Sequence, residues 1–206
     1  MGNAYEERLG TDRMLPLIFK MSLPAVAAQL VNLLYNIVDR IYIGHIPGIG
    51  TDALAGIGVT SAVIVLISSF SAIVGAGGSP LAAIALGRGN RERAGQILGN
   101  GFILLLIFTI LTSATTYLFM EPILLFTGAS ENTIGYATDY LSIYLLGTLF
   151  VELSVGLNTF INTQGRPTIA MYSVLIGAIL NIGLDPLFIF TFGMGVKGAA
   201  LATILS

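Results

Sequence analysis

The sequence has no cysteine, a single histidine and few charged residues. The lack of cysteine excludes disulfides and thiolate metal sites, and the lone His45 excludes a multi-histidine metal centre. Only 10% of the residues are charged, the formal net charge is −2, and no basic run appears, so nothing indicates a nucleic-acid partner. No short apolar core with a small-residue cleavage site follows the charged N-terminus, and we therefore expect no cleaved signal peptide.

Apolar residues dominate what is present. They make up 55% of the chain, and the mean hydropathy is +0.88. Because roughly 20 helical residues cross a bilayer core about 30 Å thick, this pattern predicts an all-α membrane protein. The predicted helices cover residues 15–44, 53–87, 94–120, 135–160, 168–192 and 198–206. The last rises only about 13.5 Å, so we expect the chain to stop inside a membrane helix as part of a longer protein.

Basic residues gather on one side of the predicted helices. Cytoplasmic loops of membrane proteins collect Lys and Arg, whereas acidic residues contribute little to orientation. We therefore predict a multi-pass protein of the cell membrane with a cytoplasmic N-terminus. The basic residues on that side are Arg8, Arg13, Lys20, Arg88, Arg91, Arg93 and Arg166.

The first predicted helix carries a polar stripe. At 100° per residue, its four polar members fall within an arc of about 80°. In lipid such a stripe must face other helices or water, and an acid at this depth indicates a functional site. For the three amides, lining a cavity and hydrogen bonding between helices remain equal alternatives. The stripe consists of Gln29, Asn32, Asn36 and Asp39.

The fifth predicted helix holds a second acid, Asp185, four residues after Asn181 and directly before Pro186. Oxygen ligands suit a hard cation such as Na⁺, and the same carboxylate could instead carry a proton. Asn158 and Thr203 could add further oxygens if their helices converge. The alternative for Asp185 is an ordinary helix-ending Asp-Pro turn.

Three further positions in the predicted helices stand out. Glu152 could line a substrate cavity, where it would attract organic cations, or pack against a neighbouring helix. Pro80 follows the segment Gly75-Ala76-Gly77-Gly78-Ser79, and we predict a kink or hinge there and at Pro186.

Three separate segments resemble signature segments of multidrug and toxic compound extrusion (MATE) transporters. They are VDRIYIGH at 38–45, NTFINTQGRP at 158–167 and NIGLDPLFIF at 181–190, and the resemblance covers essentially the whole chain. It implies a twelve-helix antiporter of two six-helix lobes that exports cationic or amphipathic compounds in exchange for Na⁺ or H⁺. This chain resembles the N-terminal lobe with a truncated sixth helix, so the missing C-terminal lobe would be its partner, from the same or a separate chain.

The resemblance also implies a cation site and no other cofactor. In prokaryotic members of the family the ligands would map onto Asp39, Asn158, Asn181, Asp185 and Thr203 of this sequence. Both Na⁺ and H⁺ remain open as the coupling ion.

Two other functions compete with this interpretation. A lipid-linked oligosaccharide flippase of the same superfamily is less favoured, because Arg40 and Lys20 are poor candidates for holding pyrophosphate. An intramembrane aspartyl protease with Asp39 and Asp185 as its dyad is disfavoured, because the flanking residues do not match such enzymes. We therefore expect a secondary transporter and not an enzyme.

Overall fold

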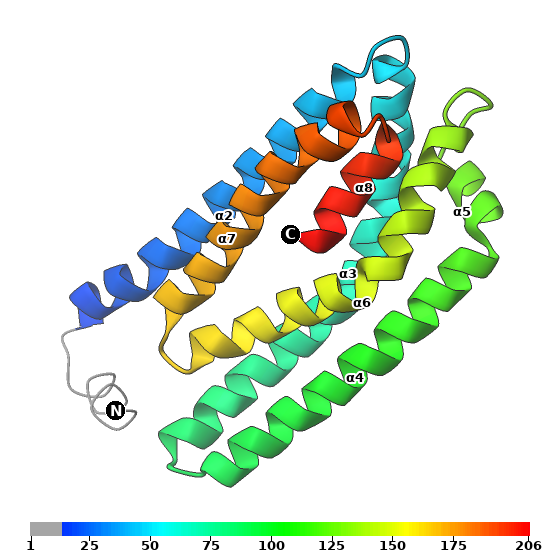
Figure 1. The fold of residues 1–206 in the computed structure, drawn as a ribbon. Coiled ribbons are helices and arrows are strands. Elements are labelled where there is room, and N and C mark those ends of the chain that lie inside the picture. Colours follow the sequence, from blue (N-terminus) through cyan, green and yellow to red (C-terminus); the bar gives the residue numbers. More distant parts are fainter. Residues whose placement is uncertain (1–13) are drawn as a thin grey trace.

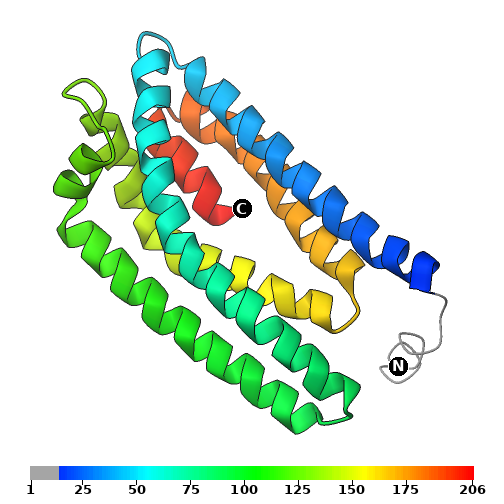
Figure 2. The same cartoon turned by 180° about the vertical axis from the view of Figure 1, so that it is seen from behind.

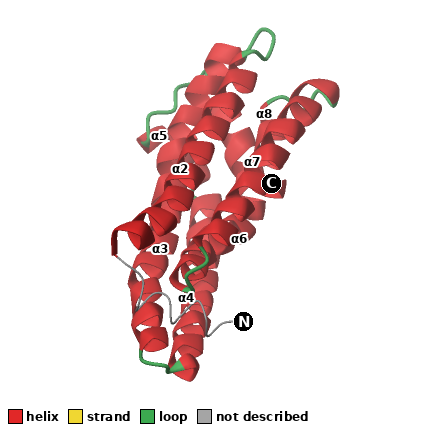
Figure 3. Cartoon of the chain, turned by 90° about the vertical axis from the view of Figure 1, so that its left-hand side faces the viewer, coloured by secondary structure: helices red, strands yellow, loops and turns green. Residues whose placement is uncertain are grey.

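The computed structural model describes residues 14–206 (Figure 1). Arg8 and Arg13, which belong to the basic cluster used to predict the orientation, lie outside these residues. All regular structure in the described residues is helical (Figure 3), which confirms the predicted all-α class. The helices are α2 (Met14–Gly44), α3 (Gly50–Gly87), α4 (Arg91–Leu118), α5 (Met120–Phe126), α6 (Ile134–Thr163), α7 (Pro167–Pro186), the π-helical turn η1 (Leu187–Thr191) and α8 (Val196–Leu205).

Four helical segments are long and apolar enough to cross a membrane: α3, α4, α6, and α7 together with η1. Helix α2 has 31 residues and carries the polar stripe. Large apolar side chains on the outer helix faces, such as Leu66, Ile110 and Leu146, are exposed, as expected for surfaces that contact lipid.

Helix α5 was not predicted from the sequence, which indicated one continuous span over residues 94–120. Helix α4 ends at Leu118, and α5 begins at Met120. Pro122 in the first turn of α5 has no backbone N–H, so it could not continue the hydrogen-bond ladder of α4. The apolar composition is the same on both sides of this break, and hydropathy alone therefore gives no sign of it.

Helix α3 remains one continuous helix through Pro80. Its glycines allow α6 to approach closely, because a Cβ at Gly75 would lie 3.0 Å from the Thr159 hydroxyl oxygen. The hydroxyl of Ser79 lies 3.2 Å from the Thr159 carbonyl oxygen and donates to it. The segment before Pro80 thus forms a helix contact, while a hinge there stays a prediction.

The helices form two groups with α8 between them (Figures 1 and 2). Helices α2 and α7 pack along one another and run in the same direction, while α3, α4 and α6 pack together on the other side. A buried core lies where α2, η1, α8 and the start of α3 meet α6. It contains Ile43, Ala53, Ile57, Tyr140, Tyr144, Ile189, Val196, Ala199 and Ala200.

Candidate cation site and cavity

The parallel packing of α2 and α7 brings two acids together near the ends of their helices. Asp39 lies close to the end of α2, and Asp185 lies one residue before the end of α7. Their carboxyl groups are close enough to interact directly. Asp185 is fully buried, although α7 does end directly after it, at Pro186.

Three more side chains surround the two acids. The Nδ2 of Asn181 lies 3.4 Å from Oδ1 of Asp185, at the long end of the hydrogen-bond range, and Asn181 is itself 1% exposed. From α6, Tyr140 lies beside Thr203 of α8 and within electrostatic range of both acids. The cluster of Asp39, Asn181, Asp185 and Thr203, with Tyr140 at its edge, is called the cation site below.

The cation site contains three buried oxygen atoms that lack a hydrogen-bond partner among the described residues: Oδ1 of Asp39, Oδ1 of Asn181 and Oδ2 of Asp185. Buried polar atoms in proteins are nearly always paired, so an unpaired set in one place calls for an explanation. Carboxylate, amide and hydroxyl oxygens are the ligands that hard cations prefer, and a shared proton would equally pair the two acids. The residues therefore fit either Na⁺ or H⁺.

Asn158 does not join this cluster, although the family resemblance implies that it would. Its Nδ2 donates to the Ala170 carbonyl oxygen at 3.2 Å and to the Ser173 hydroxyl oxygen at 2.8 Å. Ser173 precedes Asp185 by about 18 Å along α7. The tight connection between α6 and α7 places the end of one helix beside the start of the other, and this contact occupies the Nδ2 of Asn158. Asn158 also lines the cavity described next, together with Asn181 and Thr203.

A cavity of about 580 Å³ opens between α2, α6, α7 and α8. Of the predicted lining residues, Gln29 and Asn32 line it, whereas Asn36 and Glu152 do not. The Asn36 amide instead donates to the Asn32 carbonyl oxygen at 2.8 Å, within its own helix. Asn181 and Thr203 also line the cavity, so the cation site adjoins it.

The sequence analysis missed several cavity residues, among them Tyr35 and Tyr144. The available signal was a hydroxyl group at each position, and Tyr35 directly precedes Asn36 of the polar stripe. The described side chains that line the cavity are apolar, hydroxyl or amide groups, and none of them is acidic or basic.

Glu152 packs against α3 and is not among the residues that line the large cavity. The residue is fully buried. The hydroxyl of Ser68 donates to its Oε1 at 2.6 Å, and the hydroxyl of Ser71 donates to its Oε2. The acid thus bridges the middle of α6 to the middle of α3.

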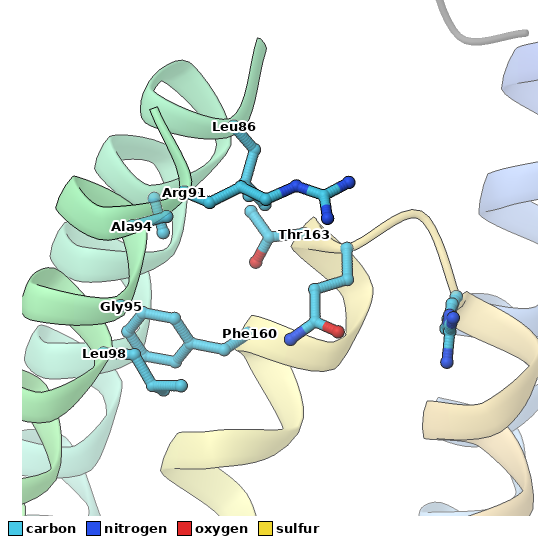
Figure 4. A pocket seen from close by; sticks show the side chains of 10 residues that line it. Leu86, Arg91, Ala94, Gly95, Leu98, Phe160 and Thr163 are labelled. Carbon is cyan, nitrogen blue, oxygen red and sulfur yellow. The ribbon is translucent and has the colours of Figure 1, made fainter. Parts of the chain in front are cut away.

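A second cavity, of about 330 Å³, lies between α3, α4 and α6, and its lining includes Arg91 and Arg166 (Figure 4). The view labels Arg91 of α4 together with Phe160 and Thr163 of α6 among the residues that line it. Its described lining residues include none of the cation site.

Comparison with known proteins gives a consistent result. The family model MatE matches residues 24–187. The chain is 34% identical over 194 residues to a protein of Shewanella oneidensis named FAD transporter, and 29% identical over 185 residues to the multidrug export protein MepA of Staphylococcus haemolyticus. These alignments cover 92% and 90% of this chain but only 42% and 40% of those relatives, so the chain spans about two fifths of their length.

Solved structures resemble the fold closely. A structure described as MATE in the bent conformation is 31% identical in sequence to this chain, with a TM-score of 0.83. The match covers 92% of this chain and 42% of the chain in that structure. A structure described as the outward-facing conformation of a multidrug resistance MATE family transporter is 30% identical, with a TM-score of 0.84. That match covers 92% of this chain and 41% of the chain in that structure.

Proposed function

This chain belongs to the MatE family, and from that premise we propose that it forms one lobe of a cation-coupled antiporter that exports cationic or amphipathic compounds. The relatives are transporters and not enzymes, which removes the protease alternative. Four apolar helices of membrane length make the chain a multi-pass membrane protein. The coupling ion, the substrate class and the orientation are parts of the proposal.

The observation that carries the proposal is the set of three unpaired buried oxygens on Asp39, Asn181 and Asp185. Two carboxylates in contact repel each other at low dielectric when both are ionised. A bound Na⁺ or a shared proton removes that repulsion and gives the unpaired oxygens a partner. Cation binding would therefore hold the ends of α2 and α7 together.

The shared residues of the cavity and the cation site support coupling between substrate and cation. Asn181 and Thr203 belong to both, so a substrate that displaces either side chain also disturbs the cation ligands. A volume of about 580 Å³ lies within the range of small-molecule sites, and the mixed amide and apolar lining suits amphipathic compounds. Alternating access requires a second lobe that rocks against this one, and we propose that the lobe comes from further chain or from a separate chain.

A second candidate substrate is FAD, because a relative with 34% identity carries that name. The lining of the cavity argues against it. FAD bears a diphosphate, and no Lys or Arg among the described residues lines the cavity to pair with it. The same reason disfavours an oligosaccharide pyrophosphate carrier.

Thermal unfolding of the purified chain in detergent, with NaCl or KCl at matched ionic strength, tests the proposal. Ligand at 100 times its dissociation constant stabilises the folded state by about 2.7 kcal/mol. We expect Na⁺, or acidification if H⁺ is the coupling ion, to raise the unfolding temperature of the wild type. Asp185→Asn and Asn181→Ala should abolish this response.

The matched control is Asp139→Asn. Asp139 is half-exposed and pairs with Lys197 at 3.2 Å, so its loss should leave the cation response intact. In the same assay an organic cation such as tetraphenylphosphonium should stabilise the chain, and FAD should not. A wild type that responds to neither Na⁺ nor pH would contradict the proposal.

A further inference from the structure

Glu152 is a buried acid that the cation site does not use. It lies in the middle of α6, about 16 Å from the nearer helix end, and is fully buried. An acid at the centre of a membrane helix costs roughly 2.5 to 3.5 kcal/mol in insertion measurements. Apolar residues of the same volume would pack the α3–α6 contact without this cost.

The described surroundings of Glu152 contain hydrogen-bond donors but no basic residue. From α3, Ser68 and Ser71 each donate to one of its oxygens. The sequence has no Lys or Arg at 53–87 of α3, at 94–118 of α4 or anywhere in α6, and Lys197 of α8 pairs with Asp139. The remaining titratable group that faces Glu152 in this part of the chain is the Tyr144 hydroxyl, on its own helix.

The two serines can satisfy Glu152 in both of its protonation states. A hydroxyl group is both a donor and an acceptor. When Glu152 is ionised, both serines donate to it. When it is protonated, its own O–H can donate to one serine oxygen, whose hydrogen then turns to a carbonyl of α3 four residues earlier. Ser61 and Ser69 of the same helix already make that bond, to Ile57 at 3.0 Å and to Val65 at 2.7 Å.

A pair of tyrosines lies between Glu152 and the cation site. The rings of Tyr140 and Tyr144 stack, with centroids 6.1 Å apart. Tyr140 is within electrostatic range of Asp39 and Asp185, and Tyr144 is within range of Glu152. Tyr144 also lines the large cavity, so this residue is shared between that cavity and the surroundings of Glu152.

We propose that Glu152, Ser68 and Ser71 form a second proton-binding site, located in the contact between α3 and α6 and separate from the cation site. Proton uptake there changes the hydrogen-bond donors that join the two helices and keeps every buried polar atom of the trio paired. Helix α6, which lines the large cavity on one side, thus carries a protonation site on the other.

Infrared difference spectroscopy of the purified chain in lipid, between about pH 4 and about pH 9, tests this proposal. A protonated carboxyl group has a carbonyl stretching band of its own. We expect Glu152→Gln to lose one such band, while an Asp39→Asn, Asp185→Asn double variant and the surface control Asp139→Asn retain it. The amide that Glu152→Gln introduces would still exchange hydrogen bonds with both serines, so the fold should survive.

The outcomes separate this proposal from the proposed function. If the Glu152→Gln spectrum keeps every band, Glu152 does not titrate and the proposal is overturned, whatever the cation response is. Should Glu152→Gln fail to fold, Ser68→Ala and Ser71→Ala provide the test. Each removes one hydrogen bond to the carboxyl group, so at least one should move the band to higher frequency, and an unchanged band in both would also overturn the proposal.

Discussion

At the scale of single residues, the helical period fixes the direction of a side chain but not what lies opposite it. Gln29 and Asn32 of the polar stripe reach the cavity, whereas Asn36 bonds to its own helix. Asp39 meets Asp185 because α2 and α7 run side by side, and no local pattern in either helix contains that pairing. The sequence therefore predicts which residue types could bind a cation, but it does not predict that α2 and α7 bring them together.

Gly198 provides a prediction at this scale, because a Cβ there would lie 2.7 Å from the backbone carbonyl carbon of Phe188. Backbone atoms cannot swing aside as a flexible side chain can. We expect Gly198→Ala to destabilise the contact of α8 with η1 by about 1–3 kcal/mol, measured by thermal or denaturant unfolding in detergent.

The control is Gly58→Ala in α3, where an added Cβ would meet nothing within 4 Å. Alanine is favoured over glycine in a helix by roughly 0.5–1 kcal/mol, so this variant should be as stable as the wild type or more so. Equal stability of Gly198→Ala and Gly58→Ala would show that α8 does not pack against η1 in this way.

At the scale of elements, each predicted span overlaps an observed helix, and the departures have local causes. The break between α4 and α5 follows from a single proline, and the α-to-π change at Leu187 follows directly after Pro186. The connection of α6 to α7 matters more for the site. It turns so tightly that Asn158 bonds to the start of α7, while the acid on that helix lies at its far end.

Asn158→Ala is therefore expected to loosen the α6–α7 pair and to leave the cation response in place. The variant loses two hydrogen bonds, each worth about 0.5–1.5 kcal/mol. The unfolding temperature of the variant without Na⁺ should be lower than that of the wild type. Adding Na⁺ or acid should still raise the unfolding temperature by as much as in the wild type. If Na⁺ or acid no longer raised the unfolding temperature while the unfolding temperature without them was unchanged, Asn158 would instead be a cation ligand.

At the scale of the whole molecule, the basic residues predict which ends of the helices face the cytoplasm. Because the chain has no cysteine, single cysteines can report this without background labelling. Glu92 lies at the start of α4 and Glu131 in the loop before α6, and both are exposed. In intact cells a membrane-impermeant maleimide should label Glu131→Cys and not Glu92→Cys, and permeabilised cells should label both.

The reverse pattern would show that the N-terminus faces outward, against the distribution of Lys and Arg. Labelling of both positions in intact cells would mean that the chain inserts in two orientations. The reverse pattern would move the cation site to the other half of the membrane, because Asp39 and Asp185 both lie toward the helix ends that the Glu131 loop shares (Figure 1).

The stacked Tyr140 and Tyr144 have an optical consequence. The chain contains no tryptophan, so excited tyrosines lose no energy to indole acceptors and emit their own fluorescence. Tyr140 is within electrostatic range of the acids of the cation site, and Tyr144 is within range of Glu152 and lines the cavity. Ionic or aromatic quenchers that arrive at either place will dim native emission, which gives the protein an intrinsic reporter without an added dye.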